Sequence, residues 1–381
     1  MRHLVALVVS LVVSMAGWPT ASAFRMYRPS KSHLAFRHDA RSELPTWDAE
    51  WKISPGDQQL GKIIAASVCD EEAFLLDRQF EMVHRVDLNQ GAILANIGYA
   101  TDPGRLWSTA SLAADCAGRT LYVIDYSGVV VFNMDSGAIV RRFTKPASFV
   151  ASVGSAVLDI GAQTLYVPGI WRSSRRSWLL EPMDRMFEGD ALGYQLDLVT
   201  GQTVPMLAAV ERGCWSLGPN CGYATLDAID SATGAKWIGA HRVGRMVGVY
   251  DAAFRRIGAI DVRSKLFLET GRRNESRSAR DIVAWNEDNS VIRFCYGFGE
   301  SIVTVHSYNR TRDWQQGQQT DFNVFMNVHA LDGTGLVSDR RLPDLPVGRD
   351  ATSLYVIDYG IGGRRIKGSN PITLLRIPID Q

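Results

Sequence analysis

Arginine and aromatic residues gather in five segments of this chain, and their side-chain chemistry suits an acidic ligand. The segments are 170–188, 241–245, 263–280, 309–321 and 359–370, and their combined net charge is +10. A guanidinium group forms paired hydrogen bonds with carboxylate, phosphate or sulfate, while Trp and Tyr rings offer flat faces to sugars or apolar rings. The pattern predicts a ligand-binding surface made of Trp171, Arg172, Arg175, Arg176, Trp178, Arg242, Arg310, Trp314, Tyr359, Arg364 and Arg365.

These positive segments have a plainer interpretation as long connections that arginine keeps solvated. The whole chain is nearly neutral, with 41 Lys and Arg against 40 Asp and Glu, so acidic residues elsewhere balance the five segments. A neutral chain has no general electrostatic attraction to nucleic acid. The predicted partner is therefore an acidic small molecule, an anionic glycan or an acidic protein surface, and nucleic acid is not expected.

Three residues are candidates for acid–base catalysis. Asp125 and Asp358 each follow the sequence Leu-Tyr-Val-Ile, and His241 lies in one of the basic segments. Carboxylates and imidazoles exchange protons with substrates, but an aspartate at the end of a strand more often accepts hydrogen bonds from turn amides. A lone histidine in a loop is usually a surface residue. No Gly-x-Ser-x-Gly, His-Glu-x-x-His or Walker sequence occurs, so hydrolase and nucleotide-binding templates find no support.

The five cysteines allow two disulfides. Cys214 and Cys221 flank the turn sequence Gly-Pro-Asn, and Cys69 and Cys116 both lie next to an aspartate, at equivalent turns of neighbouring units of the repeat described below. Both pairs are possible disulfides, and Cys295 is then left as a buried thiol. Because no Cys-x-x-Cys occurs, the cysteines predict neither a zinc site nor a redox motif.

The N-terminal residues are typical of an export signal. A basic start at Arg2 precedes an apolar run of 12 residues, Leu4 to Met15, and Ala21-Ser-Ala23 is the small-x-small pattern that signal peptidase cleaves. We expect residues 1–23 to be a signal peptide cut after Ala23, 24–45 a flexible basic leader, and 46–381 a single domain that is secreted or periplasmic. After cleavage no remaining segment is long and apolar enough for a transmembrane helix.

Internal repetition is the strongest indication of fold. One unit runs from Thr120 to Phe143 and alternates β-branched or aromatic strands with Asp/Gly turns, and Leu-Tyr-Val-Ile-Asp-Tyr recurs at 354–359. Six such units, each a four-stranded sheet, predict an all-β, six-bladed β-propeller. Residues 46–53 are expected to supply the outer strand of the last blade and so close the ring. A seventh blade remains an alternative, because residues 223–238 resemble a separate hairpin; six is preferred because Trp237 and Val249 then occupy the inner and third strands of one blade.

The repeated Leu-Tyr-Val-Ile-Asp-Tyr sequence and the Asp/Gly turns resemble the six-bladed propeller superfamily of NHL-type, TolB-like and YVTN-type proteins. The opening of the first blade, 53–63, is similar to the bacterial "6-bladed β-propeller" family. The resemblance implies a monomeric ligand- or protein-binding module; the alternative is a lactonase-like or other hydrolytic enzyme. In such a fold Asp125 and Asp358 would end inner strands near the central channel. No cofactor is predicted, although a central divalent metal held by several blades remains open.

Two sequences match N-glycosylation sites, at Asn274 and Asn309, and both are expected in loops. They matter only for a chain made in a eukaryotic cell.

Overall fold

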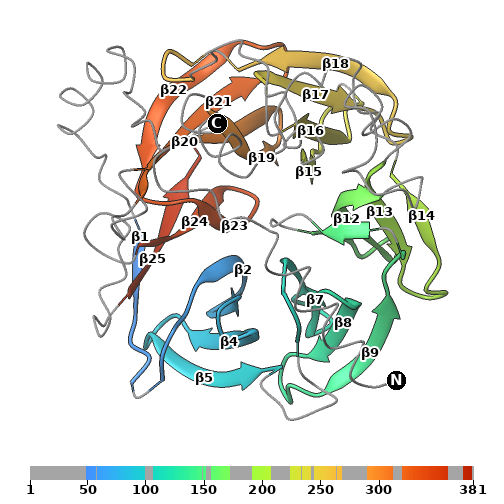
Figure 1. The fold of residues 1–381 in the computed structure, drawn as a ribbon, viewed down its shortest axis with the longest axis vertical. Helices are drawn as coiled ribbons and strands as arrows, with labels where there is room; N and C mark the ends of the chain where they lie inside the picture. The colour runs from blue at the N-terminus through green and yellow to red at the C-terminus, as the bar shows by residue number, and fades with distance from the viewer. Residues whose placement is uncertain are drawn as a thin grey trace, which may run out of the picture. The chain divides into compact units, whose positions relative to one another are not determined.

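The computed structural model describes most of the region that the repeat covers (Figure 1). The chain divides into two units at Pro45 and Thr46, and every described residue belongs to the second unit. The described residues are 49–56, 58–98, 106–147, 149–151, 156–171, 191–206, 224–232, 234–241, 244–262, 264–267, 290–311, 320–358 and 372–379. Residues 49, 50, 192, 224, 241, 308–311 and 320–323 are described by their backbone alone. No helix within these ranges is long and apolar enough to cross a membrane.

Six antiparallel sheets hold the described strands, and we call them blades one to six in chain order. Blade one contains β2 (Ile63–Cys69), β3 (Glu72–Asp77), β4 (Met82–Asp87) and β5 (Ala92–Ile97). Blade two contains β6 (Ser111–Asp115), β7 (Thr120–Ile124), β8 (Gly128–Asn133) and β9 (Ile139–Thr144). Blade three contains β10 (Phe149–Ala151), β11 (Val157–Asp159), β12 (Thr164–Trp171), β13 (Ala191–Asp197) and β14 (Thr203–Pro205), with β10 and β11 both paired to β12.

The second half of the chain repeats this plan. Blade four contains β15 (Ala224–Ala228), β16 (Trp237–His241), β17 (Met246–Tyr250) and β18 (Arg256–Asp261). Blade five contains β19 (Val291–Phe298), β20 (Ser301–Thr311), β21 (Thr320–Ala330) and β22 (Gly335–Leu342). Blade six contains β23 (Pro346–Arg349), β24 (Ser353–Asp358), β25 (Ile372–Pro378) and, from the other end of the domain, β1 (Ala49–Ile53).

Asp and Asn turns explain why the sequence repeats. The Asp87 carboxylate accepts hydrogen bonds from the amides of Asn89 and Gln90 in the turn between β4 and β5. Asp197 does the same for Val199 and Thr200 in blade three. Each turn lets the chain reverse between two strands, and so the same residue type is needed at the same place in successive blades.

The blades form a ring around a centre lined by the first strand of each sheet (Figure 1). The strand β2 of blade one contacts both β6 of blade two and β23 of blade six, and β15 of blade four contacts β19 of blade five. These strands lie so close that side chains would clash: a Cβ added to Gly348 would come within 2.1 Å of the Ala66 carbonyl oxygen. The outer rim is made by β5, β9, β14, β18, β22 and β1 (Figure 1). The fold is therefore an all-β, six-bladed β-propeller, as the repeat predicts.

The hydrophobic core lies between blades. Each of six clusters of buried residues combines side chains of two neighbouring blades. Phe74 of blade one and Phe132 of blade two, for example, belong to one cluster. Each sheet has apolar residues on both faces because both faces are covered, which accounts for strands such as β8 in which all residues but the last are buried.

The ring closes as the sequence predicts, because β1 pairs with β25 from Ala49 opposite Arg376 to Ile53 opposite Ile372. The seven-blade alternative is wrong, since β15 and β16, which span most of the proposed extra hairpin, belong to the same sheet as β17 and β18. Two details of the predicted repeat are also wrong. Trp237, expected on an inner strand, lies on the second strand of blade four, because β15 is the innermost one. Asp125 directly follows the second strand of blade two and Asp358 ends that of blade six, because β6 and β23 are the innermost strands there.

Candidate functional site

The antiparallel order of each blade sorts its connections between two edges. The turns from first to second strand and from third to fourth lie at one edge, which we call the turn edge. The connections from second to third strand, and from the fourth strand to the next blade, lie at the opposite edge, which we call the loop edge. The five basic segments found in the sequence connect strands that end at the loop edge.

Most of the residues predicted to bind ligand lie outside the described residues. These are Arg172, Arg175, Arg176, Trp178, Arg242, Trp314, Tyr359, Arg364 and Arg365; the cysteines Cys214 and Cys221, residue Asn274 and the segments 1–23 and 24–45 also lie outside them. Trp171 is described: it is the last residue of β12, half-buried, with its ring edge-on to Tyr194 at 6.2 Å between centroids. Asn309 and Arg310, expected in a loop, lie within strand β20. In the backbone register of this strand with β21, Arg310 lies opposite Asp321.

Asp125 organises the turn that follows β7. One of its carboxylate oxygens accepts hydrogen bonds from the amides of Ser127 and Gly128 and from the Ser127 hydroxyl, at 2.6–3.0 Å. The other oxygen accepts the Trp107 amide at 3.3 Å. Because the side chain is only 3% exposed, these donors enclose the carboxylate. This geometry corresponds to the turn-binding role of an aspartate rather than to a general base open to substrate.

The other two catalytic candidates are less informative. Asp358 is the last residue of β24 and half-buried, and His241 is the last residue of β16, described by its backbone. Asp77, which ends β3 at the equivalent place in blade one, is buried. Its carboxylate accepts hydrogen bonds from the amides of Gln79 and Phe80 and lies 3.2 Å from His84 Nε2. Burial alone would raise the pKa of Asp77, but the bonds from His84 and the amides of Gly61 and Phe80 lower it.

Two aromatic side chains stand exposed beside the Asp125 turn. Trp107, in the connection from blade one to blade two, is 59% exposed, and Tyr126, in the turn after β7, is 66% exposed. Their backbones are joined, because the Tyr126 amide donates to the Trp107 carbonyl at 2.7 Å. Every other aromatic side chain that the structure describes is buried or half-buried. Asp125 thus helps to hold together the backbones of two residues with exposed rings, at the loop edge of blade two.

Lys145 adds a positive charge to this place. Its ammonium lies 4.4 Å from the centroid of the Tyr126 ring and donates to the Phe149 carbonyl at 2.9 Å. Burial lowers the pKa of Lys145, while the negative charge of Asp125 acts in the opposite direction. We call Trp107, Tyr126 and Lys145 the aromatic corner. The aromatic corner combines flat apolar faces with a cation. This is the chemistry that the sequence predicts for the loop edge, but the residues that provide it differ from the predicted ones.

The centre of the ring shows no set of metal ligands among the residues described. Asp227 of β15 is the buried carboxylate there, and Arg349 of β23 occupies it with two nitrogens, at 2.7 and 3.0 Å. The Gly297 amide of β19 donates to the same carboxylate at 3.0 Å. The Asp227 carboxylate therefore joins β15 to β23 by an ion pair and to β19 by a hydrogen bond. Within the described ranges no three His, Cys, Asp or Glu side chains are placed to hold a metal ion together.

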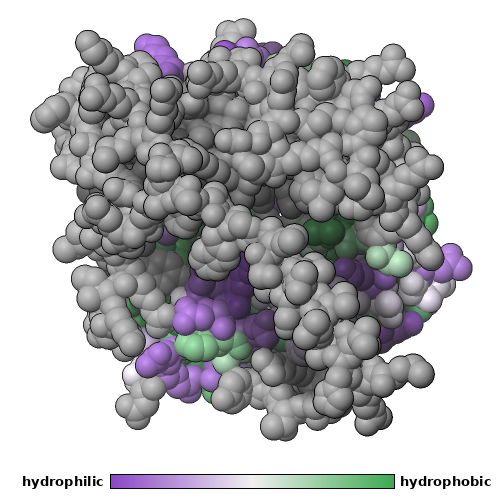
Figure 2. Space-filling model, in the orientation of Figure 1, coloured by the Kyte–Doolittle hydropathy of each residue, from purple (hydrophilic) through white to green (hydrophobic). Residues whose placement is uncertain are grey.

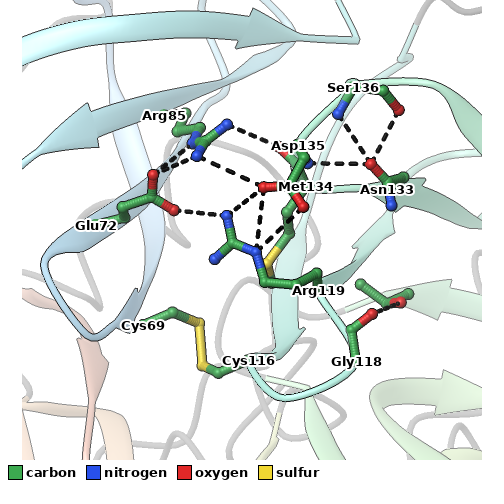
Figure 3. Close-up of polar contacts among 11 residues, drawn as sticks. Cys69, Glu72, Arg85, Cys116, Gly118, Arg119, Asn133, Met134, Asp135 and Ser136 are labelled. Carbon is green, nitrogen blue, oxygen red and sulfur yellow. Dashed lines mark hydrogen bonds and ion pairs between the residues drawn. A yellow bond between two sulfur atoms is a disulfide. The ribbon is translucent and has the colours of Figure 1, made fainter.

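The turn edge has a different character and joins blades one and two (Figure 3). The Glu72 carboxylate accepts hydrogen bonds from Arg85 and from Arg119 of the neighbouring blade, and Asp135 also pairs with Arg119. Burial alone would raise the pKa of Glu72, but the two arginines lower it. The Cys69–Cys116 disulfide, one of the two considered from the sequence, lies beside this network, and Cys295 is a buried free thiol as expected.

Where residues are coloured on the face seen in Figure 2, hydrophilic and hydrophobic ones lie side by side.

No protein-family model matches the chain, and no curated protein matches it in sequence. Among solved structures, a member of the DUF4221 family from Bacteroides vulgatus is similar in fold, with 11% identity, a TM-score of 0.62, and coverage of 87% of this chain and 96% of that one. A Bacteroides fragilis protein provisionally assigned as exported is 11% identical with a TM-score of 0.53, over 87% of this chain and 95% of that chain. These similarities support a β-propeller fold and extend to no activity.

The sequence prediction missed Trp107, Tyr126 and Lys145. One signal was available: Tyr126 occupies the same place in the Leu-Tyr-Val-Ile-Asp-Tyr repeat as Tyr359, which was included. Trp107 has no such counterpart in the repeat. Its backbone lies beside that of Tyr126 because both take part in hydrogen bonds of the Asp125 turn.

Proposed function

We propose that this propeller is an exported ligand-binding module that takes an acidic partner at its loop edge. The observation that carries the proposal is the aromatic corner, where rigid strands present two exposed rings and an ammonium group. Loops held by a rigid scaffold are common binding positions, and exposed aromatic residues are unusual on a surface without a partner. The acidic partner is an acidic small molecule, an anionic glycan or an acidic protein surface.

The charge of the chain supports an acidic partner. The five basic segments, which belong to connections at the loop edge, carry a combined net charge of +10 by sequence, and these segments would attract an acidic ligand. The enclosed Asp125 carboxylate and the Asp227–Arg349 ion pair give no support to catalysis. A binding role therefore fits these residues better than the lactonase-like alternative.

A thermal-shift and calorimetric panel tests the proposal on the mature chain. The panel contains acidic oligosaccharides, acidic peptides, small dicarboxylates, lactones and divalent cations. We expect an acidic member to raise the melting temperature in wild type and to do so less in the Trp107→Ala variant. Turnover of a lactone, or stabilisation by a divalent cation alone, would contradict the binding role.

A further inference from the structure

The aromatic corner has the chemistry of a sugar-binding site. Resting on the proposed binding function, we propose that it stacks the ring of a sugar that carries an acidic group, such as a uronic acid or a sulfated sugar within an anionic polysaccharide. Three features of the corner lead to this ligand class: the open face of the Tyr126 ring, the polar side chains around it, and the position of the ammonium group.

The Tyr126 ring has one face covered and one face open. Lys145 lies over the ring at 4.4 Å from its centroid, yet the side chain remains 66% exposed. A ring with a cation over one face keeps that exposure only if the opposite face is open to solvent. The open face of an aromatic ring is electron-rich and attracts the partly positive C–H groups on the flat side of a pyranose.

Trp107 supplies a second exposed ring, and the backbone that carries both rings is held in place before any ligand arrives. The Asp125 carboxylate accepts the Trp107 amide and the amides of the Tyr126 turn, and the Ser108 amide donates to Glu81 Oε1 of blade one at 2.9 Å. The two ring-bearing segments therefore lose little conformational freedom on binding, which favours affinity for a small rigid partner.

The neighbours of the rings favour a sugar over an apolar peptide. Ser108 follows Trp107 and Ser127 follows Tyr126 in the chain, so each ring has a hydroxyl-bearing neighbour. The Lys145 ammonium adds a charged group. An apolar peptide needs aliphatic walls around an anchor, whereas a sugar needs one flat apolar face and polar groups at its edge. The corner provides the second arrangement.

Lys145 accounts for the acidic group. Among the described residues its ammonium has one hydrogen-bond acceptor, the Phe149 carbonyl, so further N–H groups remain for a carboxylate or sulfate at the sugar's edge. The nearby Asp125 does not cancel this attraction at the surface, because its carboxylate is buried and surrounded by four donors.

Binding of defined oligosaccharides to the full mature chain tests the inference. The probes are an oligouronate, the same oligosaccharide with its carboxylates reduced to alcohols, a sulfated oligosaccharide and an acidic peptide of matched charge. We expect the wild type to bind the oligouronate or the sulfated sugar and to lose about 5- to 10-fold in affinity with Trp107→Ala or Tyr126→Ala. Lys145→Met is expected to remove the preference for the acidic form over the reduced form.

The control is Val199→Ala, a substitution of a side chain that is 65% exposed at the turn edge of blade three, where no effect on affinity is expected. Melting temperatures of all variants establish that each is folded. Binding of the acidic peptide without the sugars would overturn the sugar inference and leave the binding function standing. Binding of no probe by the wild type would overturn both. Sugar binding that is unchanged in Trp107→Ala and Tyr126→Ala would overturn the assignment to this corner.

Discussion

A single buried carboxylate can determine what the surface beside it presents. Asp125 is enclosed by the Ser127 hydroxyl and three amides, and through the amide of Trp107 it fixes a residue 18 positions earlier in the chain. Asp125 is only 3% exposed, yet it fixes the backbone that carries both exposed rings. Its role is therefore to position the aromatic corner.

Replacing Asp125 by alanine is expected to lower both stability and ligand affinity. The amides of Ser127, Gly128 and Trp107 would lose their acceptor, and leaving buried donors unpaired costs about 1–3 kcal/mol. Urea unfolding measures the loss. The control is Asp115→Ala, because Asp115 accepts the amide of Gly118 in an exposed turn, where a change of less than about 1 kcal/mol is expected. Equal losses in the two variants would contradict the special role of Asp125.

At the scale of single blades, blade five contains a buried polar layer on its face toward blade four. His306 is 0% exposed and lies between the rings of Phe267 and Phe325, at 5.2 and 5.5 Å between centroids. Its Nδ1 contacts Asn327 Nδ2 at 3.1 Å, and Asn327 in turn accepts the Asp339 amide. The arrangement requires neutral His306, because Nδ1 must accept a hydrogen bond from the amide group.

Acid is therefore expected to destabilise the protein through His306. Burial lowers the pKa of His306 to about 4, against the opposing charge of Asp339, whereas the unfolded chain keeps a pKa of 6.5. Between these values the unfolded chain binds a proton that the folded chain does not. The free energy of unfolding is thus complete above pH 6.5 and falls as the pH drops toward 4, by up to about 3 kcal/mol.

Denaturant unfolding at a series of pH values measures this slope in wild type and in His306→Gln, which keeps an acceptor for Asn327. The variant should show a flatter profile between pH 6.5 and 4. Carboxylates with a lowered pKa, such as Glu72, contribute only at more acidic pH, so their effect is separable. An identical slope in the two proteins would exclude His306 as the source.

Blades one and two are also joined covalently, and reduction of this link should weaken the fold. The Cys69–Cys116 disulfide closes a loop with a sequence separation of 47. Loops of this kind contribute about 2–4 kcal/mol to stability. We expect a dithiol reductant to lower the free energy of unfolding of wild type by that amount and to leave a Cys69→Ala/Cys116→Ala variant unchanged. A reductant effect that persists in the double variant would point to another cause.

Blade composition explains which parts of the fold the sequence could predict. The second and third strands contain β-branched and aromatic residues, as in Thr-Leu-Tyr-Val-Ile of β7, and are recognisable. Some innermost strands are rich in small residues, as in Ser-Leu-Ala-Ala-Asp of β6 and Ala-Thr-Leu-Asp-Ala of β15, and neighbouring backbones approach closely at the centre. They resemble turns in sequence, and this is why second strands were taken for inner ones.

The site was less predictable than the fold. The exposure of Trp107 and its position beside Tyr126 depend on hydrogen bonds between the end of one blade and the turn of the next. Local sequence patterns describe single strands and turns, so they contain no information about such contacts. The basic segments could be recognised from composition alone, because charge is additive along the chain.

At the scale of the whole ring, stability depends on one short strand from the N-terminal end of the domain. β1 pairs with β25 along five residues, and the Ile53 side chain is fully buried among residues that include Leu374 and Leu60. Without β1 the outer edge of blade six would be left unpaired and part of its core uncovered.

Truncation should therefore have a sharp threshold. A chain that begins at residue 46 retains β1 and is expected to melt as the mature chain does, whereas a chain that begins at residue 55 should lose several kcal/mol, since loss of Ile53 alone leaves a cavity that costs about 2–5 kcal/mol. Circular dichroism on heating compares the two. Equal melting temperatures would show that β1 is dispensable for the ring.

The pairing of β1 with β25 also sets the order in which the domain can mature. The two strands come from opposite ends of the domain, and so their contact has the greatest sequence separation in the fold, a property associated with slow folding. During synthesis or passage through a membrane pore, β1 emerges first and must wait, unpaired, for the last hairpin. A chain stalled before β25 would leave unpaired a strand with one apolar face, Trp51 and Ile53, and would be prone to aggregation, so this architecture ties successful maturation to delivery of the entire domain.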